Sequence, residues 1–219
     1  MQISIANAVP PEAVAHARSV LAKAAFTDGR ATAGWAVREV KDNAQAGPAP
    51  QVNALRETLA AQIIANPVFA LAVRPKRLVS LVFAKYGPGQ AYGAHVDNAL
   101  MEGVRTDVAF TLFLADPASY EGGELVIEQA AGDDAVKLAA GSLLAYPATS
   151  LHRVAPVTRG ERLVMVGWVR SYIRDAGKRE LLFDLDTARR RLFDAQGKTA
   201  EVDLLSKCCA NLLREWVED

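Results

Sequence analysis

Between residues 77 and 170 the chain alternates between short apolar runs and turn signals, and this alternation limits its possible folds more than any other feature. The runs are rich in Val, Leu and Phe, which favours β-strands. Turn-forming pairs such as Pro88-Gly89, Gly122-Gly123 and Arg159-Gly160 separate them. The predicted strands are 77–86, 106–114, 124–128, 135–138, 142–146, 151–157 and 162–170. So many short strands in so little sequence favour an antiparallel sandwich or barrel of the jelly-roll type.

The segments on either side of this β-rich stretch have helical periodicity. Residues 12–26 and 53–64 place apolar side chains three and four positions apart, whereas 42–50, rich in Asn, Gly and Pro, is expected to be a loop. After residue 175 two more helices are predicted by apolar stripes, and we expect both to pack on the β-rich core. The stripes are Leu181, Leu185, Ala188 and Leu192, then Leu205, Cys208, Leu212 and Trp216.

These patterns predict the α+β class with a jelly-roll core. We expect residues 1–76 to form an N-terminal helical and mixed support, residues 77–174 to form the core, and residues 175–219 to form a helical appendage. Cys208 is expected to be a small core side chain. It neighbours Cys209, and adjacent cysteines rarely form a relaxed disulfide.

Charge and hydropathy exclude several kinds of partner. The chain has 25 Lys and Arg and 25 Asp and Glu, whereas a nucleic-acid-binding domain usually has a basic excess. No apolar run approaches the ~20 residues that span a bilayer. Residues 1–10 contain no Lys or Arg ahead of an apolar stretch, so a secretory signal is not expected. We therefore expect a cytoplasmic protein that binds neither membranes nor nucleic acid.

Two of the three histidines lie in the β-rich stretch. His95 and Asp97 are two residues apart, so in an extended segment both side chains point to one face. His152, from a later predicted strand, can complete a set of two imidazoles and one carboxylate around one metal ion. Such a set leaves about three octahedral positions open and is typical of non-haem Fe(II) oxygenases. The third histidine, His16, is interpreted as an ordinary residue of the first helix.

Arg162 is the candidate for binding an organic acid beside this metal. A hairpin about the turn 158–160 would place Arg162 about 10 Å along the strands from His152. A guanidinium there suits the far carboxylate of a small dicarboxylic acid whose near end chelates the metal. Arg153 is expected to point away from His152, and Arg159 lies in the turn, so Arg162 is favoured.

Three motifs give the chain a specific resemblance to a known family. They are KYGPGQAYGAHVD at 85–97, YEGGEL at 120–125 and LHRVAPVTRGER at 151–162. Together they resemble the prolyl 4-hydroxylase-like group of Fe(II)/2-oxoglutarate dioxygenases, and more narrowly the bacterial PKHD-type hydroxylases. The tail segments 179–186 and 211–216 are also similar to that subfamily.

The resemblance implies a double-stranded β-helix in which His95, Asp97 and His152 hold Fe(II) and Arg162 holds 2-oxoglutarate. It also implies that Tyr86 and Tyr92 line the co-substrate pocket, although a packing role is an alternative for both. O2 is the other co-substrate, and ascorbate is a further cofactor in the family. The implied reaction hydroxylates a prime substrate and releases succinate and CO2.

Two other functions fit some of the same residues. A zinc hydrolase could use the two histidines and the aspartate, but it leaves Arg162 unexplained and no motif supplies a general base. A non-catalytic jelly-roll module or metal sensor would bind iron and 2-oxoglutarate without forming succinate. The prime substrate, a peptide or a metabolite, and the oligomeric state stay open, and we expect residues 42–50 and 99–105 to select the substrate.

Overall fold

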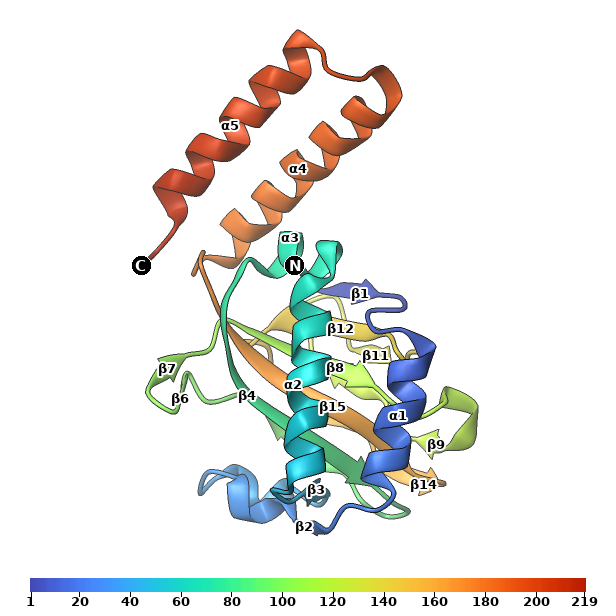
Figure 1. The fold of residues 1–219 in the computed structure, drawn as a ribbon. Coiled ribbons are helices and arrows are strands. Elements are labelled where there is room, and N and C mark those ends of the chain that lie inside the picture. Colours follow the sequence, from blue (N-terminus) through green and yellow to red (C-terminus); the bar gives the residue numbers. More distant parts are fainter.

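The computed structural model describes residues 1–219 as two facing β-sheets with helices on one side and a helical hairpin at the C-terminus (Figure 1). The larger sheet has the strand order β1-β12-β8-β15-β4-β3-β2, and every neighbouring pair is antiparallel. Its strands are β1 (Ile3–Ile5), β2 (Phe26–Asp28), β3 (Ala44–Ala46), β4 (Pro75–Tyr86), β8 (Val108–Phe113), β12 (Leu143–Pro147) and β15 (Arg162–Ser171).

The smaller sheet has the strand order β11-β10-β13-β5 and is also antiparallel. Its strands are β5 (Tyr92–His95), β10 (Leu125–Ile127), β11 (Asp134–Val136) and β13 (His152–Val154). Two short pairs lie outside both sheets: β6 (Leu100–Met101) with β7 (Val104–Arg105), and β9 (Glu121–Gly122) with β14 (Val157–Arg159).

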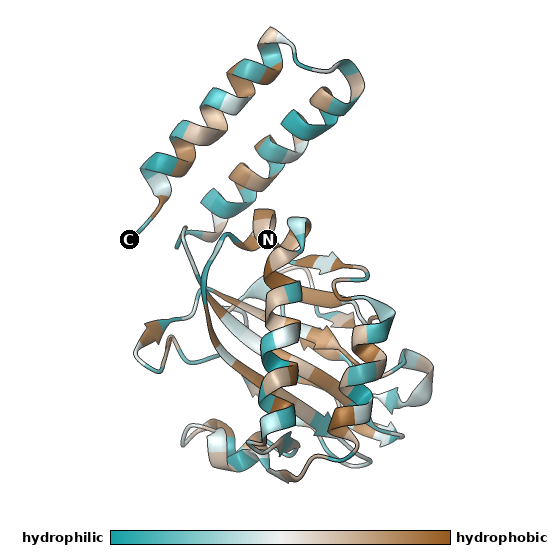
Figure 2. Cartoon of the chain, in the orientation of Figure 1, coloured by the Kyte–Doolittle hydropathy of each residue, from teal (hydrophilic) through white to brown (hydrophobic).

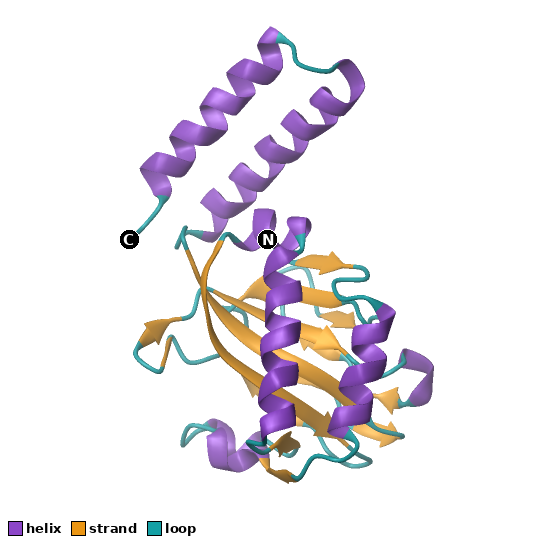
Figure 3. Cartoon of the chain, in the orientation of Figure 1, coloured by secondary structure: helices purple, strands orange, loops and turns teal.

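Alternate residues of the central strands face two different apolar layers, as the two-residue period of a strand requires. In β8, Phe110 and Leu112 pack in the layer that includes the helices, whereas Ala109 and Phe113 pack with the smaller sheet. Helices α1 (Pro11–Leu21) and α2 (Pro50–Ala65) therefore cover one face of the larger sheet (Figure 3). Apolar segments run along its strands and along these helices (Figure 2).

Proline and asparagine set the starts of the N-terminal helices. α1, α2 and α3 (Pro67–Val73) each begin with a proline, whose fixed φ suits the first helical turn. Asn66 caps α3 by accepting hydrogen bonds from the backbone N–H groups of Val68 and Phe69. None of the helices combines the length and the apolar character needed to cross a bilayer.

The α+β class is confirmed, and so are the predicted strands, except that 151–157 divides into β13 and β14. Two helices follow residue 175, as predicted. The loop expected at 42–50 is wrong in part, because Ala44–Ala46 form β3 and pair with β2 and β4. The helix predicted over 12–26 is too long, because α1 ends at Leu21 and Phe26 begins β2. Strands β1 and β2, strand β5, which ends at the first histidine of the motif, and helix α3 have no counterpart in the prediction.

The C-terminal helices α4 (Ala176–Gln196) and α5 (Ala200–Trp216) form a hairpin that projects away from the sheets (Figure 1). They pack mainly on each other, and α4 contacts the core at α3. The expectation that both helices cover the core is therefore wrong. Cys208 is exposed and Cys209 is buried, which corrects the expected core position by one residue. Cys209 lies two helical turns from buried Val202 and so shares its face.

The last residues of the chain return to the core and tie the hairpin to it. Arg105 Nη1 donates to Glu218 Oε2 over 2.6 Å, and Arg105 Nε donates to Asp107 Oδ1 over 2.7 Å. The backbone N–H of Ser171 donates to the other oxygen of Asp107 over 2.8 Å. At the N-terminus of the chain, the Met1 ammonium lies 3.0 Å from Glu180 Oε2 of α4.

Removal of residues 176–219 is expected to lower stability while leaving the core folded. The cut exposes Ile173, which packs against Leu182 and Cys209 in a small apolar cluster. Losing this burial costs about 2 kcal/mol, which corresponds to a fall in melting temperature of roughly 4–8 °C for a domain of this size. Differential scanning calorimetry measures it. In the full chain Glu218→Gln, which weakens only the partly exposed pair with Arg105, should shift the melting temperature far less. A truncated chain with the same melting temperature as the full chain contradicts the expectation.

Candidate metal centre

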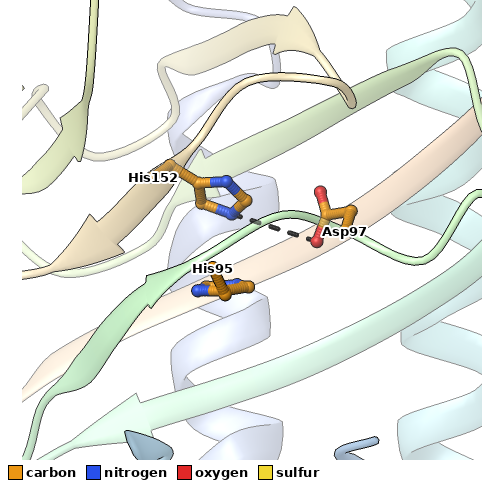
Figure 4. Close-up of side chains that lie close together, drawn as sticks. All are labelled: His95, Asp97 and His152. Carbon is orange, nitrogen blue, oxygen red and sulfur yellow. Dashed lines mark ion pairs between the residues drawn. The ribbon is translucent and has the colours of Figure 1, made fainter. Parts of the chain in front are cut away.

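Three side chains predicted from the sequence converge in the fold (Figure 4). His95 is the last residue of β5 and stands opposite His152, the first residue of β13. Their ring centroids are 4.2 Å apart, and Asp97 Oδ1 lies 3.9 Å from His152 Nε2. One ligand atom from each of the three residues lies within 4.8 Å of the others. Asp97 follows the end of β5, so it reaches the cluster from a loop and not from the strand that was assumed.

The backbone determines which ring nitrogen of each histidine is free. His95 Nδ1 is 2.8 Å from the carbonyl of Gly93, and His152 Nδ1 is 3.0 Å from the carbonyl of Ser150. A carbonyl only accepts hydrogen bonds, so each Nδ1 carries the hydrogen and donates it. The Nε2 lone pairs are therefore available to a metal, and such carbonyl partners orient imidazole ligands.

The buried surroundings of the cluster favour binding of a cation. Desolvation, with a smaller contribution from His152, lowers the pKa of His95 to about 4, so its ring is neutral at neutral pH. Burial also raises the pKa of Asp97, an effect that His152 opposes. Asp97 Oδ2 is buried without a hydrogen-bond partner. Two free imidazole nitrogens and an unpartnered carboxylate oxygen form a donor set that fits a divalent metal.

A cavity of about 270 Å³ is lined by the cluster and by Arg162. Arg162 is 1% exposed, and its Nε and Nη1 atoms are buried without hydrogen-bond partners. The guanidinium carbon lies 5.1 Å from the ring centroid of Tyr86 and 5.8 Å from that of Phe113. Burial lowers its pKa. A buried guanidinium with free donors on a cavity wall is arranged to receive an anion from solution.

The neighbouring arginines are engaged elsewhere. Arg153 lies within 3.4 Å of Glu128 and 2.7 Å of Asp133, and Arg159 donates to Glu121. Arg170 donates to the backbone carbonyl of Asp219. Arg170 Nε is also buried without a partner, but Arg170 does not line the cavity. Of these arginines, only Arg162 presents free donors on the cavity wall.

The hairpin proposed between His152 and Arg162 is wrong, although both residues line the same cavity. β13 belongs to the smaller sheet and β15 to the larger one. Arg162 instead stands opposite Tyr86 of β4. The intervening β14 pairs with β9, so the chain crosses from one sheet to the other between the two residues.

Both tyrosines singled out in the sequence line the cavity. Tyr86 accepts a hydrogen bond from Asn43 Nδ2 over 2.9 Å, and burial raises its pKa. Tyr92 stacks on His95 with ring centroids 3.8 Å apart and an interplanar angle of 19°. The two segments expected near the metal also contribute lining residues, which are Asn43, Gln45, Met101 and Glu102.

Several lining residues have no counterpart in the sequence prediction, above all Lys41 and Trp168. Lys41 precedes β3 and joins the site through a backbone bridge to Tyr92. Trp168 lies in β15, six residues beyond Arg162, where even spacing on a strand puts both side chains on one face. That spacing was a usable signal for Trp168, whereas nothing local in the sequence linked Lys41 to the histidines.

Comparisons with known proteins agree with this geometry. Residues 81–170 match the model of the 2OG-Fe(II) oxygenase superfamily, and residues 176–218 match that of the PKHD-type hydroxylase C-terminal domain. A PKHD-type hydroxylase of Picosynechococcus is 54% identical over 219 residues, with all of both chains covered. One from Maricaulis maris is 46% identical, again with all of both chains covered.

Solved structures share the fold at low sequence identity. A Pseudomonas putida prolyl-4-hydroxylase is 24% identical, with a TM-score of 0.53 over 78% of this chain and 92% of that one. The non-heme α-ketoglutarate-dependent epimerase SnoN from nogalamycin biosynthesis is 17% identical, with a TM-score of 0.59 over 80% and 81% of the two chains. With close relatives along the whole length and a His-Asp-His cluster at the motif, the chain belongs to the PKHD-type hydroxylases, a family of Fe(II)- and 2-oxoglutarate-dependent dioxygenases.

Proposed function

We propose that His95, Asp97 and His152 hold the Fe(II) of this dioxygenase. The support is the free Nε2 atoms of both rings and the unpartnered, buried Oδ2 of Asp97. One carboxylate and two imidazoles leave positions open for co-substrates. When bound, Fe(II) supplies the redox chemistry that couples conversion of 2-oxoglutarate to succinate and CO2 with hydroxylation of a C–H bond by O2.

In this proposal Arg162 binds the C5 carboxylate of 2-oxoglutarate. Its free Nε and Nη1 atoms carry the argument, because a buried guanidinium without an acceptor gains charge-assisted hydrogen bonds when a carboxylate enters. Tyr86 lies beside the guanidinium and is held by Asn43, so it lines the same end of the pocket. Tyr92 lies on the face of the His95 ring and shields it from water.

The protein's own residues orient the reactants and exclude water. The carbonyls of Gly93 and Ser150 orient the two imidazole rings. The backbone therefore fixes the positions of the two Nε2 atoms that would bind the metal. The apolar residues Leu125, Val154 and Val166 line the cavity with the tyrosines and lower its local dielectric. This strengthens the attraction between Arg162 and an incoming carboxylate.

The same proposal includes the organisation of the chain. We divide it into a support over 1–76, a double-stranded β-helix (jelly-roll) core over 77–174, and the appendage over 175–219. The two facing antiparallel sheets support the jelly roll.

Family resemblance supports ascorbate as a further cofactor. We propose the cytoplasm as the location, since free thiols such as those of Cys208 and Cys209 persist there.

Turnover without a prime substrate tests the function. The purified protein with Fe(II), 2-oxoglutarate and O2 should form succinate slowly, and omission of any one of the three should stop it. Succinate is measured by mass spectrometry, with and without ascorbate, which should increase the number of turnovers. Zn(II) in place of Fe(II) should give none. A protein that binds no 2-oxoglutarate in the presence of Fe(II) contradicts the proposal.

A further inference from the structure

Lys41 is a buried cation that the proposed chemistry does not use. It is 6% exposed and lines the cavity of the metal centre. Its Nζ donates to Thr32 Oγ1 over 2.9 Å and lies 5.2 Å from the centroid of the Tyr92 ring. An ammonium group has three hydrogens to donate, and only one has a protein acceptor. Two donors are therefore left for a ligand in the cavity.

The backbone holds Lys41 in this place. It forms a β-bridge with Tyr92, and its carbonyl accepts a hydrogen bond from Arg30 Nε over 2.9 Å. The next residue, Asp42, donates its N–H to the carbonyl of Ala91 over 2.9 Å. Lys41 is therefore fixed to the segment that leads into β5 and His95, which makes it a preorganised part of the site.

Lys41 belongs to the metal end of the cavity and not to the Arg162 end. Tyr92, the ring beneath its ammonium, stacks directly on His95. Its charge acts on His95 and Asp97, whereas the groups that act on Arg162 are Tyr86, Tyr120, Tyr146 and Glu124. A molecule bound at the metal can reach Lys41 without displacing 2-oxoglutarate from Arg162.

The charges around the cavity do not balance. Lys41 and Arg162 are cationic, Asp97 is the only buried carboxylate that lines it, and Glu102 is exposed to solvent. Fe(II) and the dianion 2-oxoglutarate together add no net charge, so one buried positive charge stays uncompensated. Burial lowers the pKa of Lys41 to about 8, while Asp97 and Asp28 oppose this effect, so the amine is still largely protonated at neutral pH.

We propose that Lys41 binds a monoanionic group of the prime substrate, such as a carboxylate, and so makes this enzyme selective for substrates with a negative charge close to the oxidised carbon. Thr32 and Gln45 complete the subsite: the Thr32 hydroxyl lies 3.0 Å from both Gln45 Oε1 and the carbonyl of Gly29, and Gln45 Nε2 has no protein acceptor. The inference rests on the proposed roles of the metal cluster and Arg162, and it adds the chemical class of the substrate.

A pair of small probes of equal shape tests the subsite. Methanesulfonate carries one negative charge, and dimethyl sulfone is its neutral counterpart. With Mn(II) and 2-oxoglutarate bound, the protein should enhance the relaxation of the methyl protons of methanesulfonate saturably, whereas dimethyl sulfone should show at least tenfold weaker binding. Proton NMR relaxation measures both affinities, and the paramagnetic effect also requires that the probe lies near the metal.

Variants at Lys41 identify the group responsible. Lys41→Met keeps the aliphatic stem, so methanesulfonate affinity should fall about tenfold to the level of dimethyl sulfone. Lys41→Arg should keep most of the preference for the anion. Lys23→Met, on the exposed surface, removes the same charge and should change nothing. The melting temperature of metal-free Lys41→Met should equal or exceed that of the parent, because an unpaired buried charge is removed.

The outcomes separate this inference from the proposed function. Equal binding of the two probes by the parent protein overturns the inference, and so does an anion preference that survives Lys41→Met. A lower melting temperature in Lys41→Met assigns the lysine a structural role and also overturns it. If Lys41→Met binds 2-oxoglutarate more weakly than the parent does, the lysine binds the co-substrate and not the prime substrate, which also overturns the inference. A parent protein that binds no 2-oxoglutarate contradicts the proposed function itself.

Discussion

Replacing Arg162 by alanine is expected to lower the affinity for 2-oxoglutarate at least ~100-fold. The guanidinium is buried with two free nitrogens, so a bound carboxylate loses its charged partner in a site that water barely enters. Breaking a pair of this kind costs on the order of 3 kcal/mol. Fe(II) affinity should hardly change, because Arg162 is not a ligand. Anaerobic titration of Fe(II) and then of 2-oxoglutarate, followed by the metal-to-keto-acid charge-transfer absorption, measures both constants.

Two substitutions control this experiment. Arg162→Lys should restore only part of the affinity, because a point ammonium cannot reproduce the planar fork of the guanidinium. Arg153→Ala removes a nearby arginine that pairs with Glu128 and Asp133 on the surface, and it should bind 2-oxoglutarate as the parent does. Unchanged 2-oxoglutarate binding in Arg162→Ala removes Arg162 from the proposed site.

Replacing Asp97 by alanine is expected to lower Fe(II) affinity at least ~100-fold, since even residues that merely orient metal ligands change affinity 10–100-fold. Asp97 is the only carboxylate of the cluster, and His95 and His152 keep a weak residual site. Succinate formation should stop at ordinary iron concentrations. Competition with a chelator of known affinity, monitored anaerobically, measures the constant.

The stability of the metal-free protein distinguishes loss of a ligand from loss of the fold. Burial raises the pKa of Asp97, so the ionised carboxylate costs the metal-free protein stability. Asp97→Asn should therefore melt no lower than the parent without metal, yet gain much less from added Fe(II). Asp133→Asn, at an exposed carboxylate, should behave as the parent does. Full activity of iron-loaded Asp97→Ala contradicts the assignment of Asp97 as a metal ligand.

Local patterns were sufficient to predict the long central strands but not the short strands at the edges of the sheets. Short Val/Leu/Phe runs between glycine-rich turns identify β4, β8 and β15, because each strand buries both faces against an apolar layer. β3 was missed because Ala-Gln-Ala has little strand preference and sits among Gly47, Pro48 and Pro50. Only its pairing with β4, far along the chain, makes it a strand.

The candidate site was predictable where a motif is continuous and obscure where the fold joins distant segments. His95 and Asp97 are two residues apart, so their convergence needed no tertiary information. Arg162 does line the cavity, but its prediction from the sequence relied on a hairpin that does not exist, because nothing in the sequence indicates that the chain crosses between sheets after His152. Lys41 reaches the site through one β-bridge to Tyr92, and no periodicity in the sequence indicates this pairing.

The register that sets His95 against His152 also governs when the site forms as the chain folds. The strands β6 to β12 lie between the two residues in sequence, and the pairing of β4 with β15 closes a still longer stretch of chain. Contacts this distant slow folding, because the entropy of closing the loop is lost before the contacts form. The three side chains of the cluster are therefore expected to come together late in folding, and the unfolded chain has no comparable cluster. Iron held by this cluster, as proposed, would bind the native state alone: it should slow unfolding more than it speeds folding, and iron-starved cells should contain a shorter-lived form of the protein.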